Sequence, residues 1–102
     1  MTDEERMTLP EHLKSTGELL TRAFPRGIDE GEYMYVLAIL YPHMADGNLT
    51  WVATVLTGRD EGLVMNDVLK AYSFKGSQEL MESTLAKLKA AGLDEWIAED
   101  EL

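Results

Sequence analysis

Residues 33–56, YMYVLAILYPHMADGNLTWVATVL, constrain the fold more than any other part of the chain, because they are compatible with two opposed structures. Two apolar runs flank Asp46 and Gly47, a dipeptide that is typical of the tight turn in a β-hairpin. The same residues also fit two short helices separated at Pro42, since proline interrupts a helix. The choice between these two structures decides the fold class.

The residues just before this segment favour a helix. In IDEGEY, Asp29 is placed to be an N-cap and Glu32 follows three positions later, which is the spacing of a capping box. Ile28 and Tyr33 have the spacing of a hydrophobic staple, and the acidic residues suit the positive end of a helix dipole. We therefore predict a helix over residues 30–41. It is apolar on all sides over its latter part, so it should form the buried centre of a bundle.

The second half of the segment also favours a helix. Asp46 or Asn48 is expected to cap it and Gly58 to end it. Against this, five of the ten residues from 48 to 57 are β-branched, which favours a strand. Pro42, however, lies close to the turn and would disrupt the pairing of a hairpin. We favour the helix, whose apolar residues recur with helical spacing at Leu49, Val52, Ala53 and Leu56.

Helical periodicity also precedes and follows this segment. Thr8 and Glu11 have the spacing of a capping box, and the residues Phe24 and Pro25 should end the first helix. Its apolar stripe is Leu9, Leu13, Thr16, Leu20 and Ala23. A further helix is expected over residues 64–72, with Asn66 as an alternative cap.

The last predicted helix begins after Ser77, its expected cap, and ends at Gly92. The residues expected to face inward are Leu80, Met81, Thr84, Leu85 and Leu88. Together these patterns predict an all-α fold, a compact bundle of about five short helices. At 102 residues the chain has room for one domain, which we place over residues 1–102.

The net charge of −10 is concentrated at the two ends of the chain. Residues 1–6 carry three acids and one base, and residues 93–102 carry five acids and no base, so both are predicted to be solvated acidic tails. An acidic protein repels phosphate backbones and anionic lipids, which disfavours nucleic acid and membranes as partners. The longest apolar run has nine residues, whereas a membrane span needs roughly 20. With no cysteine and no signal peptide, a cytoplasmic protein is expected.

The turn and helix patterns of residues 24–44, 48–58 and 66–92 can be compared with those of known families. These three stretches resemble a small actinobacterial family known as domain of unknown function 3349. FPRGIDEGEYMYVLAILYPHM looks like its proline-glycine turn and apolar second helix, and NLTWVATVLTG occupies the place of its third helix. NDVLKAYSFKGSQELMESTLAKLKAAG resembles its closing pair of helices. The resemblance covers most of residues 9–92 and implies a compact five-helix bundle. It implies no activity, ligand or catalytic residue, because the family has none assigned.

The search for catalytic, cofactor-binding and metal-binding residues leads us to expect none. His12 and His43 belong to different helices or helix ends, and no third ligand stands at metal spacing. The serines lie outside any nucleophile elbow, and the glycines form no phosphate-binding loop. Aromatic residues cluster by sequence around helix 30–41, which favours a packed core. A pocket there, in a small-ligand binder or enzyme, is kept as an alternative; the aromatic residues are Phe24, Tyr33, Tyr35, Tyr41 and Trp51.

A second alternative is a DNA-associated regulator. Residues 63–91 have the order of a helix-turn-helix pair, and Lys75, Ser77 and Gln78 precede or begin its second helix. Segment 59–92 carries five bases and five acids, whereas a DNA-recognition unit usually carries a basic stripe. Helix capping by Ser77 explains the same residues more simply.

The sequence therefore favours a non-enzymatic interaction or accessory protein over both alternatives. Its partner is expected to be another protein, bound through an exposed part of helix 30–41 or through the acidic tail that carries Trp96. Trp96 and Ile97 are expected to touch the body of the protein from a frayed turn. The chain itself is expected to be a monomer or a weak oligomer.

Overall fold

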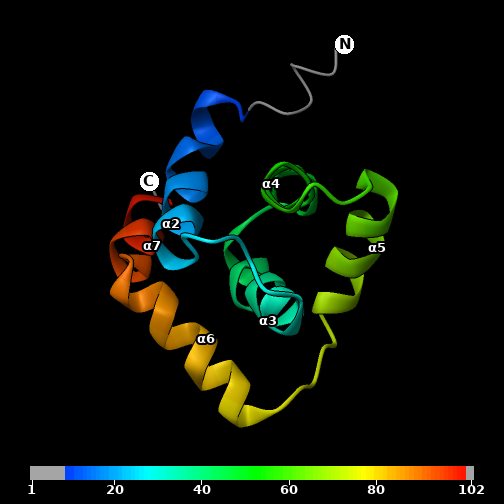
Figure 1. The fold of residues 1–102 in the computed structure, drawn as a ribbon. Coiled ribbons are helices and arrows are strands. Elements are labelled where there is room, and N and C mark those ends of the chain that lie inside the picture. Colours follow the sequence, from blue (N-terminus) through cyan, green and yellow to red (C-terminus); the bar gives the residue numbers. More distant parts are fainter. Residues whose placement is uncertain (1–8, 101–102) are drawn as a thin grey trace.

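The computed structural model describes residues 9–100 of the protein. All regular structure in this part of the chain is helical, so the predicted all-α class is confirmed there (Figure 1). None of these helices combines the length and the apolar composition that a membrane crossing requires. The elements are η1 (Glu11–Leu13), α2 (Lys14–Ala23), α3 (Glu30–Leu40), η2 (Tyr41–His43), α4 (Asp46–Thr57), α5 (Glu61–Ala71), α6 (Gln78–Ala90) and α7 (Leu93–Asp100), where η denotes a 3-10 helix.

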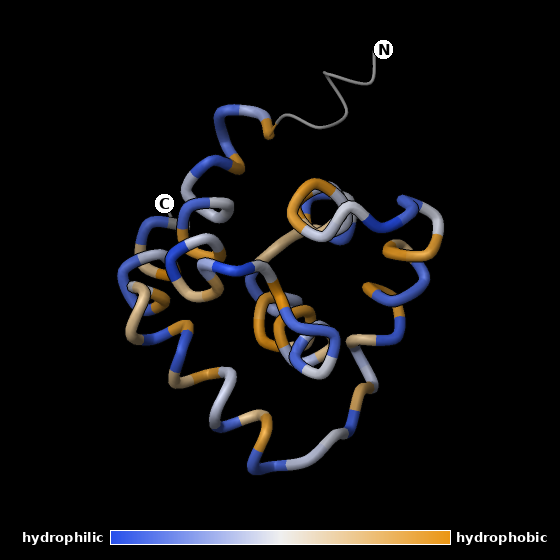
Figure 2. The backbone as a smooth tube through the Cα atoms, in the orientation of Figure 1, coloured by the Kyte–Doolittle hydropathy of each residue, from blue (hydrophilic) through white to orange (hydrophobic). Residues whose placement is uncertain are grey.

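The helix predicted over residues 30–41 is α3, and it lies at the centre of the molecule. It packs against α5 on one side and α6 on another, and Figure 1 shows it enclosed by the other helices. Val36, Leu37 and Leu40 each expose 1% of their surface or less. Figure 2 shows hydrophobic residues on α3, in the middle of the molecule, and on parts of the helices around it. The prediction of a buried central helix is therefore confirmed.

The side-chain hydrogen bonds of the capping box predicted at the start of α3 are not formed, so this prediction is wrong. Asp29 is the N-cap residue and has extended backbone angles, yet its side chain makes no capping hydrogen bond. Glu32 does not reach back to Asp29; instead its carboxylate accepts a hydrogen bond of 2.7 Å from Lys87 on α6. The partly buried Glu32 side chain thus joins two helices, because a distant cation offers it a stronger partner than a backbone N–H.

Asp46 and Gly47 form the first turn of α4 rather than a hairpin turn. The expected caps are wrong, since Ala45 is the N-cap residue and Asp46 lies inside the helix. Two of the five β-branched residues, Thr50 and Thr57, are accommodated by their hydroxyls, which donate to carbonyl oxygens four residues earlier, at 2.8 and 2.6 Å. Gly58 ends the helix in the left-handed conformation, with φ of 70°, as predicted.

The structure corrects the start of α5. This helix begins at Glu61, three residues before the predicted position, because the Asp60 carboxylate accepts a hydrogen bond of 3.2 Å from the Leu63 N–H. Asn66 lies in the middle of the helix and is not a cap.

The start of α6 is confirmed, since the Ser77 hydroxyl accepts from the Leu80 N–H at 3.3 Å. Just before it, a Cβ atom on Gly76 would clash with the Tyr35 hydroxyl oxygen, so glycine is the residue that fits there.

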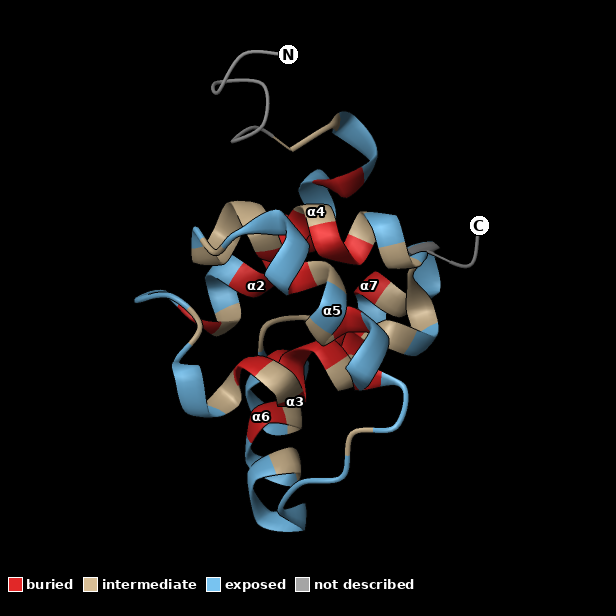
Figure 3. Ribbon diagram, turned by 90° about the vertical axis from the view of Figure 1, so that its right-hand side faces the viewer, coloured by how far each residue is buried: buried red, intermediate tan, exposed pale blue. Residues whose placement is uncertain are grey.

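The inward stripe predicted for α6 is correct except at its beginning. Thr84 and Leu88 are fully buried, and Met81 and Leu85 are half-buried. Leu80 is 44% exposed, because the first turn of α6 extends beyond the packed centre of the protein (Figure 3).

The predicted acidic tail is a helix in its described part, which is why the α-helices in residues 9–100 number six rather than about five. Helix α7 packs against α2 and α6. Leu93 and Trp96 are 2% and 4% exposed, and the Trp96 indole N–H donates to the Thr16 hydroxyl at 2.9 Å. The Arg22 guanidinium adds a hydrogen bond of 2.9 Å to the Ala91 carbonyl. The segment beginning at Leu93 therefore belongs to the core.

The first predicted helix is divided into η1 and α2, and it ends at Ala23 as expected. Leu13, Thr16 and Leu20 of the predicted stripe are buried, while Leu9 and Ala23 are half-buried. The capping role of Thr8 and the tail over residues 1–6 lie outside the described residues.

Replacing Trp96 tests whether α7 is structural. We expect Trp96→Ala to lower the free energy of unfolding by about 3–5 kcal/mol, since it empties a buried aromatic site and leaves the Thr16 hydroxyl without its donor. Glu99→Ala, on the exposed side of the same helix, should change it by less than about 0.5 kcal/mol. Urea denaturation measures both, and equal midpoints for the two variants would contradict the packing of α7.

Two buried threonines allow a matched test of hydrogen bonding in the core. The Thr84 hydroxyl has no hydrogen-bond partner among the described residues, whereas the Thr50 hydroxyl donates to the Asp46 carbonyl. We expect Thr84→Val to raise the free energy of unfolding by about 1 kcal/mol and Thr50→Val to lower it by a similar amount. Thermal unfolding measures whether each variant is more or less stable than wild type. A loss of stability in Thr84→Val would show that the Thr84 hydroxyl has a hydrogen-bond partner.

Candidate functional site

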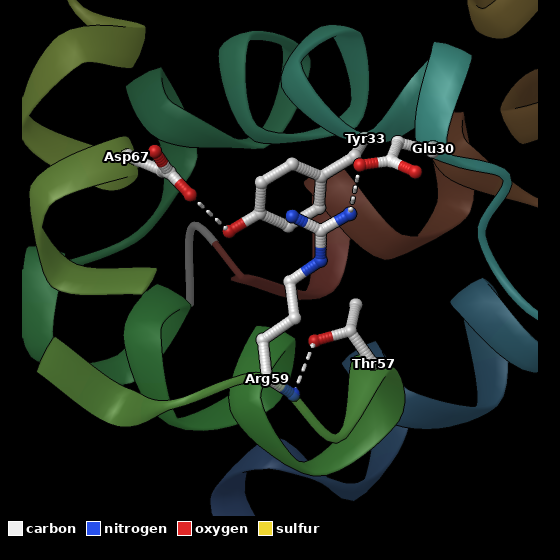
Figure 4. Close-up of polar contacts among 5 residues, drawn as sticks. All are labelled: Glu30, Tyr33, Thr57, Arg59 and Asp67. Atoms are coloured by element: carbon white, nitrogen blue, oxygen red, sulfur yellow. Dashed lines mark hydrogen bonds and ion pairs between the residues drawn. The ribbon is translucent and has the colours of Figure 1, made fainter. Parts of the chain in front are cut away.

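A cluster of polar side chains joins α3 to α5 (Figure 4). The Tyr33 hydroxyl donates a hydrogen bond of 3.0 Å to the Asp67 carboxylate on α5. The Arg59 guanidinium, from the connection between α4 and α5, lies 4.0 Å from the centre of the Tyr33 ring and 3.7 Å from the Glu30 carboxylate. Thr57 fixes the backbone of Arg59 by accepting its N–H at 3.2 Å. A cation over an aromatic face and a phenol on a carboxylate are both attractive contacts.

The electrostatics of this cluster favour a structural role. Burial raises the pKa of Tyr33 above its ordinary value, and the hydrogen bond to Asp67 and its negative charge act in the same direction. The charge of Arg59 opposes them to a smaller extent. Because the phenol keeps its proton more firmly than usual, it is a stable donor to Asp67 and a poor acid near neutral pH. The cluster thus holds α5 against α3.

This attachment determines which side of α5 turns outward. Val64, Val68 and Ala71 are buried against α3 and α4, on the same side as the polar cluster. The opposite side is exposed, and α5 forms one edge of the molecule (Figure 1). We define the outer face of α5 as the exposed residues Gly62, Leu63, Asn66, Leu69 and Lys70, together with Ser73 just beyond the end of the helix.

The outer face of α5 carries large apolar side chains in contact with water. Leu63 is 62% exposed and Leu69 is 55% exposed, and Tyr72, which follows the helix as its C-cap, is 79% exposed. The Tyr72 ring centre lies 6.0 Å from that of Tyr41, which supports it from one side. Leu80, on α6, is the fourth large apolar residue that is more than one-third exposed within the described residues.

The sequence analysis suggested two other surfaces for partner binding, the helix over residues 30–41 and the tail that carries Trp96. Neither exposes large apolar side chains as α5 does. Trp96 is buried, so it does not form a docking site on an exposed tail. Helix α3 exposes mainly its first turn, at Glu30 and Gly31, and its apolar residues face the core or are half-buried.

The two histidines make contacts of other kinds and belong to no cluster of metal ligands among the described residues. One imidazole nitrogen of His12 lies 3.4 Å from the Asn48 side-chain oxygen, and the His43 ring packs edge-on against the Trp96 ring at 6.1 Å. Within residues 9–100, no three or more acidic, histidine or cysteine side chains are grouped as metal ligands would be.

The aromatic residues around α3 fill space between helices. The Tyr35 ring meets the Phe74 ring edge-on at 5.0 Å, and its hydroxyl accepts the Ser77 N–H at 2.8 Å. Two surface grooves of about 450 and 430 Å³ lie beside α2, one bordered by Leu56 of α4 and the other by α7. Neither groove is lined by a residue of α3, where the sequence placed the alternative of a pocket.

Helix α6 is the second helix of the pair that was considered for DNA binding, and its first half is acidic. Helices α5 and α6 both pack against α3, on different sides of it (Figure 1). Glu79 and Glu82 are exposed in the first half of α6, which is the part of a recognition helix that enters the major groove, so their negative charges would face the DNA. This geometry adds nothing in favour of DNA binding.

Sequence reasoning missed the outer face of α5 because it missed the start of this helix. With Asp60 as the cap, the buried positions Val64, Val68 and Ala71 repeat at four and three residues, which leaves Leu63 and Leu69 off the inward stripe. The available signal was Asp60 itself, because aspartate is one of the residues preferred as an N-cap.

Tyr33→Phe tests the polar cluster. We expect it to lower the free energy of unfolding by about 1.5–3 kcal/mol, since a hydrogen bond to a carboxylate is lost. Because the folded-state pKa of Tyr33 is raised, its contribution is complete below the unfolded pKa of about 10 and declines as the pH rises above it. The stability difference between wild type and variant should therefore shrink above about pH 10.

Urea denaturation at pH 7 and at several values above pH 10 measures this difference. Tyr72→Phe is the control, because its ring is largely exposed, and it should have little effect at pH 7. A Tyr33→Phe protein as stable as wild type would show that the hydrogen bond to Asp67 does not hold α5.

Comparison with family models, with curated proteins and with solved structures finds no match to this chain. The resemblance to domain of unknown function 3349 therefore stays a prediction, and the candidate site rests on geometry alone.

Proposed function

We propose that the protein is a non-enzymatic interaction module that binds another protein through the outer face of α5 and the adjoining Tyr72. The observation that carries this proposal is the exposure of Leu63, Leu69 and Tyr72, at 62%, 55% and 79%. Large apolar side chains that stay in water on one helix lower the free energy when a partner covers them.

The contacts that hold α5 in place favour binding through its outer face. Helix α5 is fixed by α3, by α4 and by the contact between Tyr33 and Asp67, so its outer face keeps its shape before a partner arrives. A preformed surface loses less conformational entropy on binding than a mobile one. Tyrosine is also among the residues that contribute most to protein interfaces, and Tyr72 is placed at the edge of this surface.

A protein fits this surface better than a nucleic acid or a small molecule. Lys70 is the single basic residue on the outer face of α5, whereas binding to a phosphate backbone needs several cations. The face is convex, being the side of one helix, whereas small ligands bind in concave sites. A helix face that carries two exposed leucines and a single charge suits a surface of mixed apolar and polar character on another protein.

Capture of binding partners with a matched pair of variants tests the proposal. We expect Leu69→Glu to lose the proteins that wild type recovers from a lysate of the source cells, because it places a charge in the apolar surface. Leu80→Glu makes the same change on α6, outside this surface, and should recover them as wild type does. Recovered proteins are identified by mass spectrometry, and circular dichroism confirms that both variants are folded.

The outcome that contradicts the proposal is a Leu69→Glu protein that recovers the same partners as wild type. Equal loss in Leu69→Glu and Leu80→Glu would also contradict it, since binding would then not depend on α5 in particular.

A further inference from the structure

The outer face of α5 continues into a stretch of the chain that carries basic residues and no acid. Residues 68–78 include two lysines, and the nearest acids in the sequence are Asp67 before them and Glu79 after them. Asp67 accepts the hydrogen bond from Tyr33, so its carboxylate is turned toward α3. We define the basic end of α5 as four exposed residues, Leu69, Lys70, Tyr72 and Lys75.

The two lysines at the basic end of α5 are not paired with acids of the protein. Lys14, Arg59 and Lys87 each form an ion pair with a glutamate. Lys70 and Lys75 form none with any residue in the described part of the chain. Their positive charges are therefore free to meet the carboxylates of a partner.

The chain that follows α5 is fixed by Tyr35 of α3. The Phe74 ring meets the Tyr35 ring edge-on at 5.0 Å, and the Ser77 N–H donates to the Tyr35 hydroxyl at 2.8 Å. Tyr72 and Lys75 lie on this fixed connection, next to the end of α5. Their positions are thus set before a partner arrives, which reduces the conformational entropy lost on binding.

Much of the negative charge in the described residues lies on another side of the molecule. Helix α7 carries Asp94, Glu95 and Glu99, and it is separated from α5 by α3 (Figure 1). Charges more than roughly 8 Å apart are largely screened at physiological ionic strength, and the molecule is 26 Å across in its shortest direction. At the basic end, the negative end of the α5 dipole and the positive end of the α6 dipole offset each other. The two lysines therefore set the local charge.

We propose that the outer face of α5 binds an acidic amphipathic segment of another protein. Apolar side chains of the segment cover Leu63, Leu69 and Tyr72, and its carboxylates meet Lys70 and Lys75. This inference rests on the proposed function and names the chemistry of its partner. The apolar contacts supply affinity, and the charges select acidic segments over basic ones.

The charges along α5 also orient the bound segment. Asp60 and Glu61 stand at the N-terminal end of the helix, whereas Lys70 is near its C-terminal end and Lys75 follows it. Carboxylates of a partner are repelled at the first end and attracted at the second. The acidic part of the segment therefore lies beside Tyr72, and its less acidic part lies beside Leu63.

Two lysines suit a short acidic segment better than a long polyanion. A nucleic acid or an anionic lipid surface is bound through several cations at once. The basic end of α5 offers two cations, and the acids at the other end of the helix repel an extended row of phosphates. An acidic protein segment needs only a few carboxylates at one end.

Two synthetic peptides test this inference. The acidic peptide carries leucines at helical spacing flanked by glutamates, and the control peptide has lysine in place of each glutamate. Each is titrated into isotopically labelled wild-type protein at about 0.15 M salt, where long-range charge is screened. We expect the acidic peptide to shift the NMR signals of residues 63–75 and the control peptide to leave those signals unchanged.

Charge reversal supplies matched variants of the protein. Lys70→Glu and Lys75→Glu should each weaken binding of the acidic peptide about tenfold, since an attraction becomes a repulsion. Lys89→Glu makes the same change in net charge at an exposed lysine of α6 and should leave the affinity unchanged. A protein with both Lys70→Glu and Lys75→Glu should bind the control peptide at residues 63–75 instead. Circular dichroism confirms that the variants are folded.

An acidic peptide that shifts no signal of α5, or equal weakening in Lys75→Glu and Lys89→Glu, would overturn the inference. Tighter binding of duplex DNA or of phosphatidylglycerol vesicles to the same residues would also overturn it. If the proteins captured from the lysate are lost in Leu69→Glu and kept in Lys70→Glu, this inference fails while the proposed function stands. If they are kept in both variants, the proposed function fails as well.

Discussion

The fold depends on one requirement, which is that α3 be removed from water. Its latter part is apolar on all sides, and Val36, Leu37 and Leu40 are almost completely buried. An isolated helix of 11 residues is not stable in water, so α3 persists only because other helices cover it. Covering a leucine in this way contributes roughly 1.5–3 kcal/mol, and the helices around α3 gain the same term from their own inward residues.

The polar residues at the start of α3 fix how the surrounding helices are oriented around it. Glu32 binds Lys87 on α6, Tyr33 binds Asp67 on α5, and Tyr35 accepts the N–H of Ser77. These neighbouring positions on one helix point to three surrounding segments, because successive helical side chains are about 100° apart. The apolar residues make α3 the centre, and these polar contacts fix which side of α5 and α6 turns inward. The outer face of α5 is a consequence of that orientation.

The sequence predicted the features that depend on neighbouring residues. The stop at Phe24, the left-handed Gly58 and the cap at Ser77 are local effects of backbone chemistry, and all three are present. The sequence predicted only that Trp96 touches the body of the protein from a frayed turn. Its full burial could not be predicted in this way, because its partner Thr16 is 80 residues away and the neighbouring acids suggested a solvated tail. The candidate surface was missed for a related reason, since an exposed leucine resembles a core leucine until the inward side of its helix is known.

Amide hydrogen exchange measured by NMR tests the central position of α3 most directly. If α3 is the centre on which the other helices depend, the amides of Val36, Leu37 and Leu40 exchange only through global unfolding, with the largest protection in the chain. The amides of α5 and α7 then exchange as fast or faster, through local opening. The account is contradicted if the α3 amides exchange faster than those of the surrounding helices, because those helices would then hold together without it.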